Sequence, residues 1–275
     1  MIINHNASAA YASRNLGITQ SNLAQDIARL SSGQRITRAA DDAAGLAVSE
    51  TLRAQVRGLN QAERNIQNGV SFVQATEGYL QGTQDILHRL RELAVQSANG
   101  VFTDADREMI RVEADQLKQE VDRIAEHAQF NGMNLLDGTF AEGGDRDGMY
   151  IQVGANVDQR VQMFVGEMTV NALQIGEINL ADGEDANMAI ATLDSALLAV
   201  SSQRADLGAY QNRFESAARS VAVASENLQA SESRIRDADM ATEVVNFTRN
   251  QILSQSGSAM LAQANVQSQA VLQLL

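Results

Sequence analysis

The most regular pattern in the chain runs through residues 186–235, which read ANMAIATLDSALLAVSSQRADLGAYQNRFESAARSVAVASENLQASESRI. An apolar side chain recurs there at every seventh position: Leu193, Val200, Leu207, Phe214, Val221, Leu228 and Ile235. Companion positions such as Arg204 and Gln211 are mostly polar or small, so the apolar seam is narrow. A seven-residue repeat is typical of helices packed side by side. The stretch therefore predicts one long helix that needs a helical partner.

A second regular stretch, residues 46–98, supplies that partner. It has the same spacing, at Leu52, Leu59, Ile66, Val73, Leu80 and Leu87. A helix of this length extends about 80 Å at 1.5 Å per residue, and the sequence contains no proline to interrupt its hydrogen bonds. We expect the two long helices to zip the N- and C-terminal halves of the chain together.

A third helix and a small β-rich insert complete the predicted fold. Thr103 and Asp106 resemble a capping box, and a buried stripe follows at Ile110, Ala114, Leu117, Val121, Ile124 and Ala128. The short gap after Asn99 and Gly100 predicts an antiparallel hairpin with the preceding helix. Alternating residues with Gly and Asn turns predict short strands within about 130–185. We place these strands at the far end of the hairpin that the N- and C-terminal halves of the chain form. The predicted fold class is mainly α, a long antiparallel helical bundle or coiled coil.

Residues 31–45 are rich in turn formers and are predicted to link two helical segments. Within this link, Asp41 and Asp42 could be mistaken for a catalytic pair. We interpret both as caps of the helix that follows, because an Asp beside a helix start accepts hydrogen bonds from free backbone N–H groups.

The two ends of the chain lack charged side chains. Residues 250–275 contain no Asp, Glu, Lys or Arg, and neither do residues 1–13, where His5 is the only basic side chain. A membrane-spanning helix needs about 20 mostly apolar residues, whereas the final segment repeatedly carries Gln, so we predict no membrane insertion. Both segments are instead predicted to be helices enclosed by other protein, disordered in the free chain and ordered when many copies assemble.

One apolar face is expected on each terminal helix. The residues assigned to self-assembly are Leu16, Leu23, Ile27, Leu30, Leu253, Met260, Leu261, Val271 and Leu274.

Composition argues against several classes of function. The net charge of −13 disfavours nucleic acid as a partner, and the lack of cysteine removes thiolate nucleophiles, thiolate metal sites and disulfides. His5, His88 and His127 lack metal-ligand spacing, and no phosphate loop or nucleophile motif occurs. We therefore predict a non-enzyme without cofactor or metal. The N-terminus also lacks the pattern of a cleavable secretion signal.

Several segments resemble bacterial flagellin. They are DDAAGLAVSE (41–50), LRELAVQSANG (90–100), QFNGMNLL (129–136), LGAYQNR (207–213) and ENLQASESRIRDADMA (226–241). The start MIINHN, GVSFVQATEGYLQGTQDIL (69–87), VGANVDQR (153–160) and the ending VLQLL resemble more narrowly the flagellins in the core of spirochaete periplasmic flagella. The similarity covers both terminal regions almost completely.

This resemblance implies a filament subunit for motility, exported by the flagellar secretion system. Residues 1–44 with 237–275 would form the inner polymerisation domain, and 45–236 the outer shell, including the insert. The implied partners are further copies of the chain, an export chaperone at the C-terminal helix, filament cap and hook-junction proteins, sheath proteins and a second flagellin. The implied location is the periplasmic flagellum, with an extracellular filament as the alternative.

Arg89, Leu93 and Glu113 occupy the positions of the flagellin surface that an innate immune receptor recognises. Two other functions remain open from sequence alone, a hook–filament junction protein and a non-flagellar coiled-coil scaffold. The complete C-terminal motifs favour the filament subunit over the first, and the charge-free ends favour it over the second.

Overall fold

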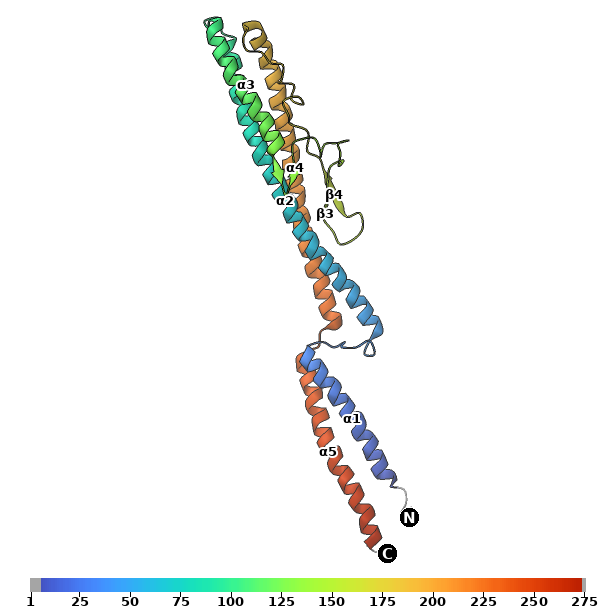
Figure 1. The fold of residues 1–275 in the computed structure, drawn as a ribbon. Helices are drawn as coiled ribbons and strands as arrows, with labels where there is room; N and C mark the ends of the chain where they lie inside the picture. Colours follow the sequence, from blue (N-terminus) through green and yellow to red (C-terminus); the bar gives the residue numbers. More distant parts are fainter. Residues whose placement is uncertain (1–5, 274–275) are drawn as a thin grey trace. The chain divides into compact units, whose positions relative to one another are not determined.

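The computed structural model describes residues 6–273, with side chains up to residue 266. In this part, helices dominate, and two short strand pairs lie between α3 and α4 (Figure 1). The helices are α1 (Ala7–Ser32), α2 (Ala43–Ser97), α3 (Asp104–His127), α4 (Gly183–Arg236) and α5 (Met240–Gln273). The chain forms two compact units, Arg57–Ser225 and the pair Met1–Val56 with Glu226–Leu275, called here the central unit and the terminal unit.

The core of the central unit lies along the heptad positions of α2 and α4. The side chains that fill it are almost completely buried, and they include Ile66, Val73, Leu80, Leu87, Leu193, Val200, Leu207 and Phe214. Arg91 forms an ion pair with Asp194 at 2.6 Å, and Ser225 donates a hydrogen bond to Asn60 at 2.9 Å. These contacts place the two helices antiparallel and confirm the predicted pairing.

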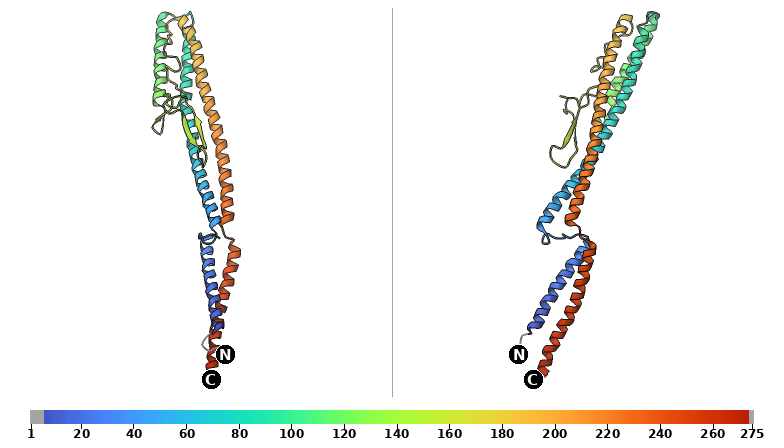
Figure 2. Two further views of the ribbon diagram at one scale, coloured as in Figure 1. Left: turned by 90° about the vertical axis from the view of Figure 1, so that its right-hand side faces the viewer. Right: turned by 180° about the vertical axis from the view of Figure 1, so that it is seen from behind.

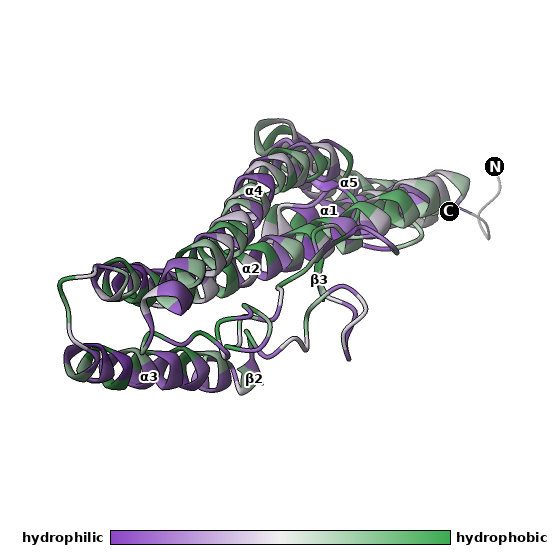
Figure 3. Cartoon of the chain, turned by 90° about the horizontal axis from the view of Figure 1, so that it is seen from above, coloured by the Kyte–Doolittle hydropathy of each residue, from purple (hydrophilic) through white to green (hydrophobic). Residues whose placement is uncertain are grey.

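The third helix folds back on α2 as predicted. Thr103 and Asp106 form the capping box at its start, and Arg89 on α2 pairs with Glu113 on α3 at 2.8 Å. Hydrophilic residues dominate the surface of α3 (Figure 3), while its predicted stripe is buried or half-buried. The helix leads into β1 (Gln129–Phe130) and β2 (Met133–Asn134), which pair across a turn with positive φ at Asn131 and Gly132.

The strands β3 (Met149–Gln152) and β4 (Arg160–Met163) form an antiparallel hairpin in the insert. The predicted strands are confirmed, but their predicted position is wrong. The hairpin packs along the side of α2, because α2 has no side chain at Gly58 and Gly69. A Cβ at Gly58 would lie 2.8 Å from the Cβ of Ala155, and one at Gly69 would lie 3.3 Å from Ile151.

The coil that precedes α4 closes the far end of the central unit. The hydroxyl of buried Ser97 donates to the Leu180 carbonyl at 2.6 Å. Lys118 on α3, the only lysine in the sequence, donates to the Ile178 carbonyl at 2.9 Å and pairs with Asp115 at 3.0 Å. These contacts hold the coil against α2 and α3.

In the link between α1 and α2, the two adjacent aspartates make different hydrogen bonds. Asp42 accepts a hydrogen bond from the Gly45 N–H at 2.8 Å, so it caps α2 as predicted. Asp41 instead accepts from the backbone N–H groups of Arg38 and Thr37, both at 3.0 Å. These bonds, the one from Arg38 foremost, lower the pKa of Asp41. The prediction that Asp41 also caps α2 was wrong, because its carboxylate is engaged by the preceding turn.

Candidate assembly surface on the terminal helices

The helices α1 and α5 lie alongside each other in the terminal unit (Figure 2). The half-buried side chains of Leu16, Leu23 and Leu30 recur every seven residues on α1. On α5 the buried or half-buried positions form two series with the same spacing: Glu243, Asn250, Gly257 and Ala264, and Phe247, Ser254 and Leu261. The seam of α5 therefore mixes polar and small residues with two large apolar ones, unlike the mainly aliphatic seam of the central unit.

Polar contacts join the two helices along this seam. Asp26, 5% exposed, accepts a hydrogen bond from the Asn250 side chain at 2.6 Å. Arg29 pairs with the buried Glu243 at 3.5 Å. A Cβ at Gly257 would lie 3.4 Å from Leu16 Cδ1, so a larger residue there would press on α1.

The apolar side chains of α5 point mainly away from α1. Val245, Ile252 and Val266 are 56%, 61% and 56% exposed. Their seven-residue spacing puts them on one face, opposite the seam that begins at Glu243. On α1, Tyr11, Ile18 and Ile27 are also more than half exposed. Soluble chains rarely expose so many apolar residues together unless another protein covers them.

A groove of about 300 Å³ runs between α1 and α5. Its lining residues are Tyr11, Ala12, Asn15, Leu16, Thr19, Leu253, Ser256, Gly257 and Met260. None of these side chains is charged at neutral pH, so the groove suits contact with apolar side chains.

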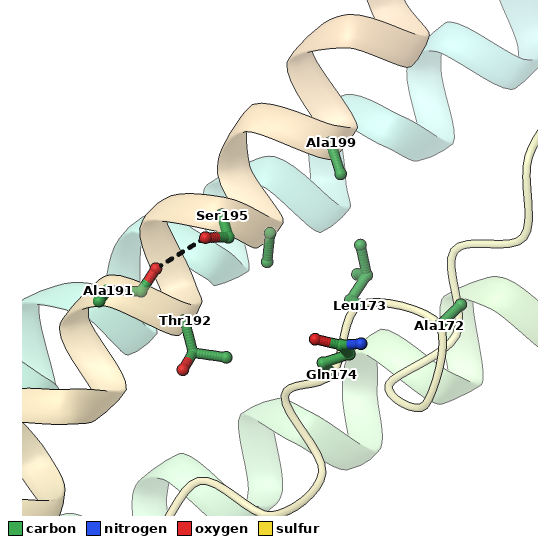
Figure 4. Close-up of a pocket in the computed structure, with 8 residues that line it drawn as sticks. Ala172, Leu173, Gln174, Ala191, Thr192, Ser195 and Ala199 are labelled. Carbon is green, nitrogen blue, oxygen red and sulfur yellow. Dashed lines mark hydrogen bonds between the residues drawn. The ribbon is translucent and has the colours of Figure 1, made fainter.

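A second groove, of about 410 Å³, lies in the central unit (Figure 4). It runs between α4 and the coil at Ala172, Leu173 and Gln174, and small side chains of α4 line its other wall. The hydroxyl of Ser195 in this wall donates to the Ala191 carbonyl at 3.0 Å. No titratable side chain lines this groove.

The described residues contain no cluster of metal-ligating side chains. Nowhere between residues 6 and 273 do three or more His, Asp or Glu side chains gather in a way that could hold a metal ion. In the same range, no helix combines the length and apolar character of a membrane span.

Comparison with known proteins finds a family match that includes both charge-free ends of the chain. The model of the bacterial flagellin N-terminal helical region matches residues 3–141, and that of the C-terminal helical region matches residues 190–275. This chain is a member of the bacterial flagellin family. It is 61% identical to a flagellar filament 30.7 kDa core protein of Treponema maltophilum, over the full length of both chains.

Other flagellin relatives match over the same full length. They include flagellin FlaB2 of Treponema pallidum, at 55% identity, and a flagellar filament core protein of Brachyspira hyodysenteriae, also at 55%. The solved flagellin of Bacillus cereus has a TM-score of 0.50 and 31% identity, covering 57% of this chain and 88% of its own. A hook-associated protein of Vibrio parahaemolyticus has a TM-score of 0.60 but only 14% identity, covering 72% and 100%, and shares the fold alone.

As a flagellin, this protein is a structural subunit that polymerises with itself into the flagellar filament for motility, and its family is not enzymatic. The full-length identity to filament core proteins decides against the junction-protein and scaffold alternatives.

The self-assembly residues chosen from sequence fall into three groups in this flagellin. Leu16, Leu23, Leu30 and Leu261 are half-buried, whereas Ile27, Leu253 and Met260 are exposed. The side chain of Val271 and the whole of Leu274 lie outside the described residues. Sequence reasoning missed Tyr11, Ile18, Val245, Ile252 and Val266; the seven-residue spacing of the last three was the signal that could have identified them.

The candidate receptor residues of this flagellin lie on α2 and α3. Arg89 and Glu113 are exposed and paired, and the carboxylates of Glu113 and Glu92 raise the pKa of Arg89. Leu93 is only 2% exposed and packs in the core. Its side chain is therefore unavailable to another protein unless α2 and α3 rearrange.

Proposed function

We propose that the chain builds a periplasmic flagellar filament through its terminal helices, with residues 1–44 and 237–275 as the inner polymerisation domain and 45–236 as the shell. The exposed apolar face of α5, which begins at Val245 and includes Ile252 and Val266, carries this proposal. Burying one such side chain contributes about 1.5–3 kcal/mol. A few of them on each subunit would drive assembly of helices that pack weakly within one chain.

A substitution at Leu253 tests the assembly surface. Leu253 is 49% exposed in the single chain, so Leu253→Asp should leave the helical content of the central unit unchanged. In a polymer the added carboxylate would be buried without a partner, which costs several kcal/mol. We expect Leu253→Asp to abolish sedimentable filaments, whereas the control Leu253→Met keeps them. Filaments of normal yield from Leu253→Asp would refute the assembly surface.

Leu261→Asp gives a second test of the same surface, at a half-buried position that faces the α1 seam. Filament loss is expected here as well. Loss from Leu261→Asp but not from Leu253→Asp would mean that only the pairing of α1 with α5 matters.

Limited proteolysis tests the domain boundaries. Helices in proteins owe most of their stability to tertiary packing, so the ends of the free chain should be cleaved first. We expect the monomer to be trimmed to about residues 45–236, and the polymer to resist at both ends. A free chain that resists end to end would contradict ordering on assembly.

The periplasmic location rests on the similarity to filament core proteins of Treponema and Brachyspira. Protease added to intact cells should spare the protein, and the same protease should degrade it after the outer membrane is permeabilised. Degradation in intact cells would favour an extracellular filament.

The remaining partners are those that the family resemblance implies. An export chaperone would cover the apolar face of α5 before assembly during passage through the flagellar secretion system, and cap and junction proteins would meet the terminal helices at the filament ends. Sheath proteins and a second flagellin would contact the shell. A chain truncated after residue 239 should lose the chaperone in co-purification, while keeping any partner of the central unit.

Because Leu93 is buried, only Arg89 and Glu113 of the three candidate receptor residues are exposed in the folded chain. Arg89→Ala should weaken receptor signalling by the free chain without changing filament yield. Unchanged signalling would remove this surface from consideration.

A further inference from the structure

The methionine in the groove between α1 and α5 is exposed in the single chain. Met260 is 63% exposed, and it lines the groove together with Tyr11, Leu16 and Leu253. The groove lining is uncharged, so the thioether of Met260 contributes apolar contact area at the surface that assembly would cover.

Methionine sulfur is the main oxidisable sulfur in this protein, because the sequence contains no cysteine. Reactivity toward oxidants follows exposure. Met163 and Met168 are buried, whereas the exposed methionines of the described part are Met109, Met188, Met240 and Met260. Among these four, only Met260 lines the groove between the terminal helices.

We propose that Met260 is an oxidation site that controls entry into the filament: a peroxide oxidises it in the free chain, the sulfoxide excludes the chain from assembly, and assembly protects the same sulfur. This inference rests on the proposed function, since it requires the groove to be covered in the polymer. It adds a second requirement to the proposed function: a chain assembles only if Met260 is in the reduced, thioether form.

The chemistry balances with hydrogen peroxide as the oxidant. A sulfur lone pair of Met260 attacks one peroxide oxygen, the O–O bond breaks, and the displaced hydroxide takes up the proton to leave water. The thioether loses two electrons and becomes a sulfoxide, and the peroxide is reduced. Methionine sulfoxide reductases reverse this change, so an excluded chain could be returned to the pool of competent subunits.

The consequence for assembly follows from polarity. A sulfoxide adds a strong hydrogen-bond acceptor to an apolar surface, and burying an acceptor without a donor costs about 1–3 kcal/mol in proteins. The groove also contains the donor groups of Tyr11, Asn15, Thr19 and Ser256, but oxidation turns a flexible apolar side chain into a larger polar one, which disrupts a packed interface even where one donor is near. The fraction of oxidised chains that enter the filament should therefore be lower than that of reduced chains by roughly tenfold or more.

The first experiment needs no variant. Purified full-length monomer is treated with limiting hydrogen peroxide until about half of the exposed methionines are oxidised, polymerised, and separated by sedimentation. Peptide mass analysis then compares Met260 sulfoxide in pellet and supernatant, with Met109 on α3 as the measure of dose. We expect a roughly tenfold depletion of Met260 sulfoxide in the pellet relative to Met109. Equal proportions in both fractions would overturn the proposal.

The second experiment reverses the order. Preformed filaments and monomer receive the same peroxide, and oxidation at Met260 should be at least about tenfold slower in filaments, because exposure governs the rate. Equal rates would show that the sulfur remains open to solvent after assembly, which also overturns the proposal.

Variants separate Met260 from the other methionines. Met260→Leu and Met109→Leu chains are each compared with their own untreated sample, so any change in basal assembly cancels. Peroxide should reduce the filament yield of Met109→Leu as it does for the wild type, and should leave the yield of Met260→Leu close to its untreated value. Equal losses in both would assign the effect to another residue. The unoxidised Leu253→Asp variant reports on the proposed function alone, so the two ideas fail independently.

Discussion

The central and terminal units are both built on antiparallel pairs of long helices, but they differ in what they bury. Along α2 and α4 the buried heptad positions are aliphatic or aromatic, with Leu80 and Phe214 fully enclosed. Along α1 and α5 the buried positions include Asp26 and Glu243, while Ile252 and other apolar residues face outward. The central pair buries its heptad side chains within one chain, whereas the terminal pair leaves apolar side chains exposed, and these form the surface that we propose for assembly.

The largest expected effect is on the free energy of unfolding, and it should differ between a core position in α2 and an exposed position in α5. Leu80→Ala should lower the free energy of unfolding of the free chain by about 2–5 kcal/mol, through lost burial and the cavity left behind. Ile252→Ala should change it by no more than about 0.5 kcal/mol, because Ile252 is already exposed. Denaturant unfolding followed by circular dichroism measures both. Similar losses would mean that α5 is stabilised within the chain as strongly as α2.

An intermediate effect is expected from the polar seam of the terminal unit. Asn250→Leu removes the donor that Asp26 accepts and leaves a buried carboxylate unpaired, at a cost of about 1–3 kcal/mol. Combining it with Asp26→Leu should recover most of this loss, since neither polar group then remains. The melting temperature of filaments at fixed protein concentration is the readout. A double variant as unstable as the single one would show that the seam requires its polar contact.

Helix glycines allow a smaller test in each unit. Gly78 in α2 and Gly17 in α1 have nothing within 4 Å of an added Cβ, and alanine is favoured over glycine in helices by about 0.5–1 kcal/mol. Gly78→Ala should raise the unfolding free energy of the free chain by that amount. Gly17→Ala should mainly raise the helix content of the free chain in circular dichroism, if α1 orders on assembly. An equal rise in unfolding free energy from both would contradict that difference.

The smallest expected effect concerns the start of α3. The Thr103 hydroxyl, followed by its backbone N–H, lowers the pKa of Asp106 in the folded chain. Stability from this cap is therefore present above the unfolded-state pKa of about 3.9, and it is lost as the pH falls through the lower folded pKa. In acid titrations of the central unit, Asp106→Asn should flatten this part of the pH dependence. No change in slope would mean that the cap contributes equally in both protonation states.

Much of the central unit could be predicted from sequence because packed helices require apolar residues at regular spacing. The recurrence of Leu193 through Val221 identified α4, and the spacing of Ile66 through Leu87 identified its partner. No such sequence pattern indicates the position of the β3–β4 hairpin. It depends on missing side chains at Gly58 and Gly69, and the printed sequence does not reveal which surface a glycine exposes.

The terminal helices were predicted less completely because their apolar residues lie on more than one face. Leu253 and Met260 suggested one stripe, and both line the groove between the two helices; the polar residues Glu243 and Asn250 also lie in the seam against α1. Sequence reasoning treats a buried carboxylate as unfavourable, but Asp26 is stabilised by the hydrogen bond that it accepts from Asn250 at 2.6 Å. Such pairings between residues far apart in the chain appear only in three dimensions.

The engagement of Lys118 bears on how this filament can be visualised. Its amine already donates to the Ile178 carbonyl and pairs with Asp115, so reagents that acylate lysine would have to break the contact that holds the coil in place. The sequence also contains no thiol. One cysteine introduced at an exposed site such as Leu198 would therefore be the sole target for a maleimide dye, and fluorescence from it would report a single known position in every subunit.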